Sequence, residues 1–171
     1  MGMLRLQAEL LTREAFAAFG DVIETVGSIH RTINLGHAER YDDLARVDVS
    51  EEGGRPLINI FRAHPWPEPI RIHSMERHPL SSQAFIPLMD APFLVVVAAP
   101  TERLRPDDLR AFVTNGRQGV NYHRAVWHHA LLALAPSCDF LVIDRGGAGV
   151  NCDEVYFEND EVVLSYRVTR G

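Results

Sequence analysis

Short apolar segments, each the length of a β-strand, recur along most of the chain and are separated by turn signals. They are LINIFR (57–62), SQAFIPL (82–88), FLVVVAA (93–99), LRAFVT (109–114) and DFLVIDR (139–145). The segment 93–99 is apolar throughout and therefore predicts a strand buried on both faces, whereas 109–114 alternates. Roughly eight to ten such strands with closely spaced turns favour a sandwich or jelly roll.

Helical signals are confined to the N-terminal region. Thr12 has the character of a helix N-cap, and Gly20 stands just past the end of the expected helix. Phe16 and Phe19 are three residues apart and would face the core together. Helix-sized segments between the strands are missing, so a parallel α/β sheet is disfavoured.

Two features between residues 28 and 62 suggest a polar site. Residues 28–45 form a long polar stretch that contains Arg40, and a loop of this size in a compact domain is often functional. In LINIFR, Ile58, Ile60 and Arg62 share one face of the expected strand, which we take to be the inner face. An arginine that ends an apolar face lies at the rim or reaches into a cavity.

Composition indicates one globular domain, spanning residues 1–171, with 46% hydrophobic and 23% charged residues. The net charge of −6 and the absence of basic runs argue against nucleic acid as a partner. No apolar run is long enough to span a membrane, and the N-terminus lacks the features of a signal peptide. Cys138 and Cys152 do not form a disulfide framework, which favours the reducing cytoplasm.

The stretch GRQGVNYHRAVWHH (116–129) is the first candidate for a functional site. It follows a glycine-rich turn and holds His123, His128 and His129. If one unbroken strand carried all three, His123 and His129 would share a face and His128 would lie on the other. A single histidine is usually structural, but a histidine cluster beside such a turn favours a site. Trp127 is expected to form a packing wall of the site, that is, to contribute packing rather than to contact a ligand.

A second polar group lies about forty residues earlier. Glu76 and His78 are two residues apart and should share a face of an extended segment, and Gln83 could fold back beside them after the serine pair 81–82. Such a group can bind a divalent metal with His123 as a further ligand, or hold a small polar substrate and move protons. It could also be a surface loop whose polar residues face water.

Both stretches resemble known motifs. ERHPL (76–80) with QAFIPL (83–88) resembles the first cupin motif, and GVNYHRAVWHH (119–129) resembles the second. More narrowly, the whole chain resembles the ureidoglycolate lyase family, also called ureidoglycolate hydrolases. The matching stretches are AFGDVIE, INLGHAERYDDLA, ERHPLSSQAFIPL, LRAFVTNGRQGVNYHRAVWHH and DFLVIDRGG.

The resemblance implies an all-β fold, a cupin-type double-stranded β-helix or jelly-roll barrel with a few short helices, in a protein that is typically a homodimer. It implies cleavage of (S)-ureidoglycolate to glyoxylate and urea in allantoin degradation. Some members have been linked to a divalent metal such as nickel. The cupin ligand positions fall on Glu76, His78, Gln83 and His123. Because Gln83 stands where a glutamate is expected, we expect any metal to be weakly bound or dispensable.

The implied reaction assigns roles to these residues. The substrate is a small molecule with a hydroxyl and a ureido nitrogen on one carbon, and it collapses once the hydroxyl loses its proton. His123 or His78 would be the base, and Glu76 would orient it or act as the acid.

The remaining expected roles concern binding. Arg62 or Arg40 would pair with the substrate carboxylate. Gln83 and Tyr122 would add substrate contacts. Arg145 is a third candidate for the carboxylate, but a structural pair with Asp144 or Asp153 is the preferred interpretation.

Two alternatives remain open at this point. One is a metal-dependent cupin enzyme of other specificity, which would need a ligand set richer in histidine. The other is a cupin that binds a small molecule without catalysis, which would need the polar face but no proton transfer.

Overall fold

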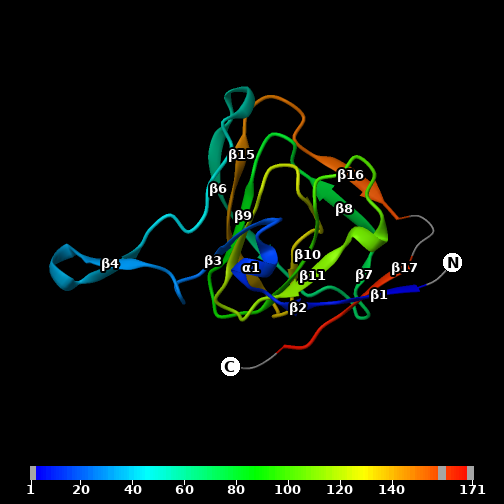
Figure 1. Cartoon of the computed structure of the whole chain (residues 1–171), viewed down its shortest axis with the longest axis horizontal. Helices are drawn as coiled ribbons and strands as arrows, with labels where there is room; N and C mark the ends of the chain where they lie inside the picture. The colour runs from blue at the N-terminus through cyan, green and yellow to red at the C-terminus, as the bar shows by residue number, and fades with distance from the viewer. Residues whose placement is uncertain (1–2, 158–160, 169–171) are drawn as a thin grey trace.

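The computed structural model describes residues 3–157 and 161–168, and their fold is all-β, as predicted (Figure 1). One sheet has the strand order β16 (Asp153–Tyr156), β8 (Ser74–Arg77), β13 (Trp127–His128), β10 (Phe93–Ala98), β11 (Arg110–Val113) and β2 (Glu9–Leu10), with β14 (Leu132–Ala133) also paired to β10. A second sheet has the order β3 (Gly20–Ile23), β12 (Gly119–Tyr122), β9 (Gln83–Pro87), β15 (Cys138–Gly146) and β6 (Arg55–Ala63). A small third sheet comprises β1 (Met3–Gln7), β17 (Glu161–Ser165) and β7 (Arg71–Ile72).

Strand β10 lies between two hydrophobic cores. Its six residues are all buried, as the apolar run predicted. Phe93, Val95 and Val97 pack in the core that joins the first two sheets. The alternate residues Leu94 and Val96 pack in a second core, on the side of the small sheet. In the described residues the sheets remain open at their edges, so the cupin-type fold is present here as layered sheets rather than as a closed barrel.

Helical structure is limited to short pieces. The helix α1 (Arg13–Phe16) begins as predicted, because the Thr12 hydroxyl accepts a hydrogen bond from the backbone N–H of Ala15 at 3.1 Å. Phe16 and Phe19 are both buried, with ring centroids 5.9 Å apart. The remaining short helices are the 3₁₀ turns η1 (Asn34–Gly36), η2 (Glu51–Gly53) and η3 (Pro106–Asp108). No helix in the described part of the chain has the length and apolarity needed to cross a bilayer.

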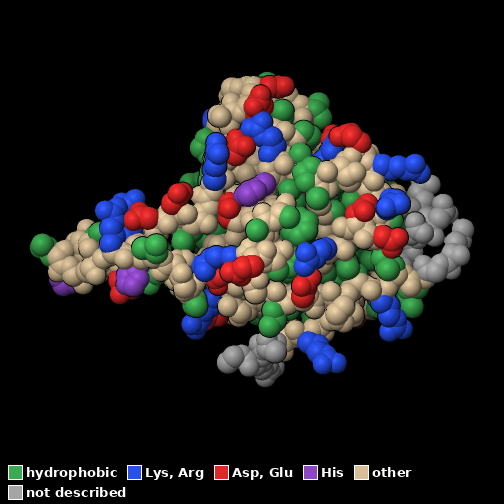
Figure 2. Space-filling view, viewed as in Figure 1, with side chains coloured by type: hydrophobic (Ala, Val, Ile, Leu, Met, Phe, Trp, Pro, Cys, Tyr) green, Lys and Arg blue, Asp and Glu red, His purple; other side chains and the backbone are tan. Residues whose placement is uncertain are grey.

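The long polar stretch is a hairpin rather than an irregular loop. Strands β4 (His30–Ile33) and β5 (Ala38–Tyr41) pair with each other and form an arm that projects from the body (Figure 1). The arm carries charged side chains along its length (Figure 2). At its tip, Leu35 is fully exposed. Most residues of the two strands are exposed, so the polar composition of this segment is that of a hairpin that projects into solvent.

Strand β6 corrects one expectation. Ile58, Ile60 and Arg62 do share a face, but Ile58 is 76% exposed and Ile60 is 56% exposed, so this is the outer face. The alternate residue Phe61 turns toward the body, where its ring lies against Phe85. Because both faces of β6 carry apolar residues, the hydrophobic pattern does not show which face is buried.

Candidate active site

The candidate active site begins with Glu76 on β8 and with His78, which directly follows the strand, and their side chains lie close together as predicted. Strand β13 pairs antiparallel with β8 and places His128 directly opposite Glu76. Both residues of β13 are buried, but their side chains point to opposite faces of the sheet. Trp127 packs in the second core, and His128 lies on the other face. The register of two strands therefore brings together two histidines and one carboxylate.

These three side chains form a compact cluster. One ligand atom of each of Glu76, His78 and His128 lies within 4.8 Å of the corresponding atoms of the other two. His128 Nε2 is 3.4 Å from Glu76 Oε1, and the rings of His78 and His128 have centroids 5.0 Å apart. The contact with His128 lowers the pKa of the Glu76 carboxyl despite partial burial, so Glu76 is ionised at neutral pH.

The environment of His128 favours a cation at this cluster. The residue is 2% exposed, and burial lowers its pKa, so the imidazole is neutral. Its Nδ1 lies 3.2 Å from the carbonyl oxygen of Val126, and its Nε2 lies 3.4 Å from Glu76 Oε1. A neutral imidazole carries one ring proton and can donate to only one of these two oxygens, and Nε2 is buried without a hydrogen-bond partner. Two electron-rich atoms facing each other in a buried site suit a metal ion or a proton between them.

His78 is held from both sides. Its Nδ1 is 2.6 Å from the carbonyl oxygen of Asn151, and its Nε2 is 3.1 Å from Oε1 of Gln83. Gln83 thus folds back beside His78 past the serine pair 81–82, as predicted. The Gln83 side chain also hydrogen-bonds to Asp144, whose other partner is Asn59 Nδ2 at 2.9 Å. Burial raises the pKa of the Asp144 carboxyl.

Tyr122 supports the cluster from β12. Its ring stacks on His128 with centroids 4.3 Å apart and an interplanar angle of 15°. Tyr122 is buried, and burial raises the pKa of its phenol, which is therefore neutral. Since Tyr122 and His128 come from facing sheets, this stack fixes the imidazole plane across the interior.

A cavity of about 340 Å³ opens beside the cluster, and its volume suits a small metabolite. It is lined by His78, Ser81, Gln83, Asp144, Arg145, Val150, Asn151 and Cys152. The lining offers a base, a carboxylate, an amide and a guanidinium in one place. This combination can bind a small polar anion and exchange protons with it.

His123 lies elsewhere. Ala125 has a φ of +62°, and Val126 N–H donates to the carbonyl oxygen of His123 at 3.2 Å, so a turn separates β12 from β13. The turn resets the alternation of side chains, and His128 rather than His123 joins Glu76. His123 Nε2 lies 3.1 Å from Asp21. His129 is also apart from the cluster, with its ring edge-on to Trp66.

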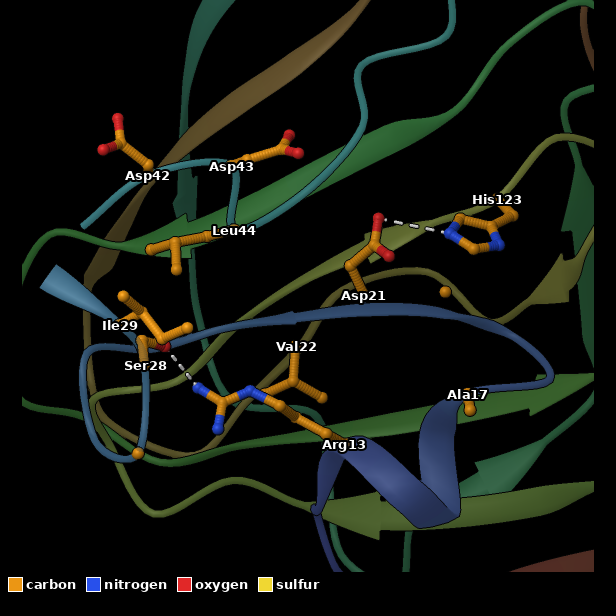
Figure 3. Close-up of a pocket in the computed structure, with 12 residues that line it drawn as sticks. Arg13, Ala17, Asp21, Val22, Ser28, Ile29, Asp42, Asp43, Leu44 and His123 are labelled. Carbon is orange, nitrogen blue, oxygen red and sulfur yellow. Dashed lines mark hydrogen bonds and ion pairs between the residues drawn. The ribbon is translucent and has the colours of Figure 1, made fainter.

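The His123–Asp21 pair borders a separate cavity of about 470 Å³ at the root of the arm (Figure 3). Arg13 lines its other side and bonds to Ser28 Oγ at 2.7 Å. Asp42 adds a carboxylate from the arm. This cavity has charged walls, but its lining shares no residue with the cavity beside His78.

The arginines predicted to bind substrate are also away from the cluster. Arg62 pairs with Asp139 through two hydrogen bonds, at 2.8 and 2.9 Å, on the exposed face of β6. Arg40 lies on the arm and pairs with Asp42. Neither lines the cavity beside His78.

The third arginine does line that cavity, and its expected structural pair is absent. Arg145 donates to the backbone carbonyls of Glu51 and Ala148, not to Asp144 or Asp153. Trp127 is the packing wall that was predicted: it lies in the second core, with the Arg77 guanidinium 4.7 Å from its ring centroid.

The donor set of the cluster fits a divalent metal of the kind that the cupin resemblance implies. Two imidazoles and one carboxylate are a common set for first-row transition metals. The unpartnered Nε2 of His128 supplies a ready ligand atom. Gln83, expected as a ligand, instead contacts His78 Nε2, and His123 lies outside the cluster.

Comparison with known proteins identifies the family of the chain. The family model described as ureidoglycolate lyase matches residues 3–164. A protein of Pseudomonas aeruginosa named ureidoglycolate lyase is 54% identical over 162 residues, which cover 95% of this chain and 96% of that protein. Proteins of the same name from Azotobacter vinelandii (53% over 162 residues, 95% and 98% covered) and Burkholderia mallei (56% over 152 residues, 89% of each) are similar as well. The chain belongs to the ureidoglycolate lyase family.

Proposed function

We propose that this protein is a ureidoglycolate lyase that cleaves (S)-ureidoglycolate to glyoxylate and urea. The observation that carries the proposal is the cluster of Glu76, His78 and His128 beside a cavity of about 340 Å³, in a chain of this family. A reaction that needs proton transfer at one carbon, and no covalent nucleophile, suits a site built of imidazole and carboxylate groups.

The elimination requires one proton to leave the hydroxyl and one to reach the nitrogen. His78 is the proposed base, because it lines the cavity and its ring is fixed by Asn151 and Gln83. Loss of the hydroxyl proton lets the carbonyl form while the C–N bond breaks. The same imidazole can return the proton to the departing nitrogen, so that urea leaves as a neutral molecule. Glu76, ionised beside His128, stabilises the positive charge on His78 during the transfer.

The predicted metal belongs to this proposal. Glu76, His78 and His128 would hold the ion, which when bound would polarise the substrate oxygen. His78 would then be a ligand rather than the base, so the metal-assisted reaction and proton transfer by His78 are alternatives within the proposal. Nickel is the candidate that the family resemblance suggests. Gln83, predicted as a substrate contact, lines the cavity and keeps that role. Tyr122, predicted likewise, does not line the cavity, and we assign its ring to the orientation of His128.

The predicted catalytic role of His123 is a competing proposal. It would place the chemistry at the cavity at the root of the arm, where Asp21 is its partner. The interior cluster is favoured because its carboxylate and two imidazoles lie beside one another and His128 is 2% exposed, whereas the His123 side chain is 46% exposed.

The test is release of urea from purified ureidoglycolate, measured with a coupled urease assay. The wild-type protein should release urea and glyoxylate in equal amounts. The matched pair of variants is Glu76→Gln, which should be strongly impaired, and Glu39→Gln on the arm, which should behave as wild type. Absence of urea release by the wild-type protein, with and without nickel, would refute the assignment.

One observation supports a second candidate function. A set of two histidines and one carboxylate also serves oxygen-activating metal enzymes, so a metal-dependent cupin of other specificity is the alternative. Oxygen uptake with small α-keto or α-hydroxy acids, measured on iron-loaded protein, separates the two. A cupin that only binds such acids would show neither oxygen uptake nor urea release.

We further propose that the protein works as a homodimer. The exposed apolar row of Ile58 and Ile60 on the edge strand β6 offers a surface that a second copy could cover. Arg62 on the same face, or Arg40 on the arm, would bind substrate only if a second copy brought it to the cavity. Sedimentation at micromolar concentration tests the proposal, and Ile60→Glu should shift the protein toward monomer if this face is the interface.

A cytoplasmic location completes the proposal. It is supported by two free cysteines, of which Cys152 is exposed and would be prone to oxidation outside a reducing compartment. Cell fractionation with an antibody to the chain is the direct measurement.

A further inference from the structure

Arg145 is the one residue of the cavity lining beside His78 that carries a fixed positive charge. It lies on β15, next to Asp144, and shares the cavity lining with His78 and Gln83. Any anion that enters this cavity therefore meets a guanidinium and an imidazole together.

The guanidinium is held in place by the backbone. Nε and Nη2 donate to the carbonyl oxygen of Glu51 at 3.2 and 2.8 Å, and Nη2 also donates to that of Ala148 at 2.7 Å. Gly54 makes room for this arrangement, because a Cβ at that position would lie 2.3 Å from Nε of Arg145. A side chain fixed in this way loses little further freedom when it binds a ligand.

The charge of Arg145 is not neutralised by a carboxylate. Its partners are neutral carbonyls, and within the described ranges 3–157 and 161–168 it forms no ion pair. The nearby acids are engaged by other groups: the Glu51 carboxylate pairs with Arg124, and Asp153 pairs with Arg77. In contrast, Arg62 and Arg40 already have carboxylate partners.

The donors that remain are suited to an oxyanion. Nε and both donor positions of Nη2 are occupied by the carbonyls, which leaves the N–H groups of Nη1 without a partner in the described residues. Charge-assisted hydrogen bonds from a guanidinium to a carboxylate are among the strong polar contacts in proteins.

We propose that Arg145 binds the carboxylate of the substrate and of the glyoxylate product, and so determines the specificity of the cavity for small 2-hydroxy and 2-oxo acids. This inference rests on the proposed function, because the carboxylate in question belongs to the proposed substrate. With the carboxylate at Arg145, the neighbouring carbon and its hydroxyl would lie in the cavity that His78 also lines.

The experiment compares two ligands that differ only in charge, glycolate and its neutral amide, glycolamide. Calorimetry of the wild-type protein should show glycolate binding at least tenfold more tightly. In Arg145→Gln this preference should disappear, with a loss of roughly 10- to 100-fold in glycolate affinity, the usual worth of a hydrogen bond to a charged group. Arg117→Gln is the matched control, because it removes an exposed arginine that already has a carboxylate partner, Asp90. The preference of this variant for glycolate should equal that of the wild type.

Kinetics provide a second readout. Arg145→Gln should raise KM for ureidoglycolate more than it lowers kcat, and Arg145→Lys, which keeps the charge, should be intermediate. If Arg145→Gln does not fold, which circular dichroism would show, a crystal soaked in glyoxylate tests the same point in the wild-type protein. Carboxylate density at Arg145 supports the proposal, and density at another cation overturns it.

The outcomes separate this inference from the proposed function. If the wild-type protein releases no urea yet prefers glycolate through Arg145, the lyase assignment fails and the carboxylate site stands. If urea is released and Arg145→Gln keeps the full preference for glycolate, the lyase stands and the inference is wrong.

Discussion

Tyr122 and His128 come from different sheets, yet their rings are stacked at a centroid distance of 4.3 Å and an angle of 15°. The stack holds the imidazole whose Nε2 faces Glu76. The aromatic plane, more than the phenol hydroxyl, is thus the feature that orients His128.

We expect Tyr122→Phe to retain kcat within a few fold, because the ring remains. Tyr122→Leu should lower kcat by about 10²-fold, since a small displacement of a catalytic group has an effect of that size. Steady-state urea release measures both, with thermal unfolding as the control for folding. A large rise in KM for Tyr122→Phe would instead assign the hydroxyl to substrate binding.

Alanine variants of the histidines distinguish the two candidate sites. His78→Ala and His128→Ala should lower kcat by roughly two to four orders of magnitude, the usual contribution of a positioned acid or base. His123→Ala should stay close to wild type, because His123 is paired with Asp21 outside the cluster. The reverse result, with His123→Ala inactive and His78→Ala active, would move the chemistry to the cavity at the root of the arm.

Metal binding has its own matched pair of variants. Nickel added to chelator-treated protein should bind to the wild type and to Gln83→Ala, but not to His128→Ala, because the unpartnered ligand atom belongs to His128. Equilibrium dialysis with metal analysis measures this directly. If His128→Ala binds nickel as well as the wild type, the cluster is not the site. Assays in chelator then test whether the metal is dispensable, as Gln83 led us to expect.

Tyr166 gives a prediction for alkaline pH. Its hydroxyl donates to Glu68 at 2.7 Å, and this hydrogen bond raises the pKa of the phenol to about 12. A raised pKa means that the contribution to stability is complete below pH 10, the ordinary value, and is lost as the pH rises toward 12. Wild type should therefore exceed Tyr166→Phe in thermal stability near pH 9, and the difference should vanish near pH 12. Because Tyr166 is only partly buried, we expect the difference in thermal stability to be small. A constant difference across this pH range would contradict the prediction.

Much of the fold could be predicted because its signals are local. The apolar run at β10 needs no knowledge of its neighbours to indicate burial on both faces, and Thr12 caps its helix through residues a few positions away. The face shared by Glu76 and His78 also follows from strand alternation alone.

The third member of the site could not be found in this way. The choice of His128 over His123 depends on the turn at Ala125, where an alanine adopts a positive φ that its residue type does not favour. Without that break, alternation places the wrong histidine beside Glu76. Pairing of β13 with β8 is a long-range contact, and no local pattern in either strand specifies it. The signal that was available is Trp127, because a large apolar residue on one face implies that His128 occupies the other.

The position of β10 between the two cores has a consequence for how the molecule unfolds. Alternate residues of β10 belong to different cores, so β10 cannot detach from one core without also leaving the other. Opening of the small sheet would thus be coupled to opening of the catalytic layers, and the chain should melt in a single cooperative transition. A ligand bound beside His78 would then slow amide exchange in β1 and β17 of the small sheet.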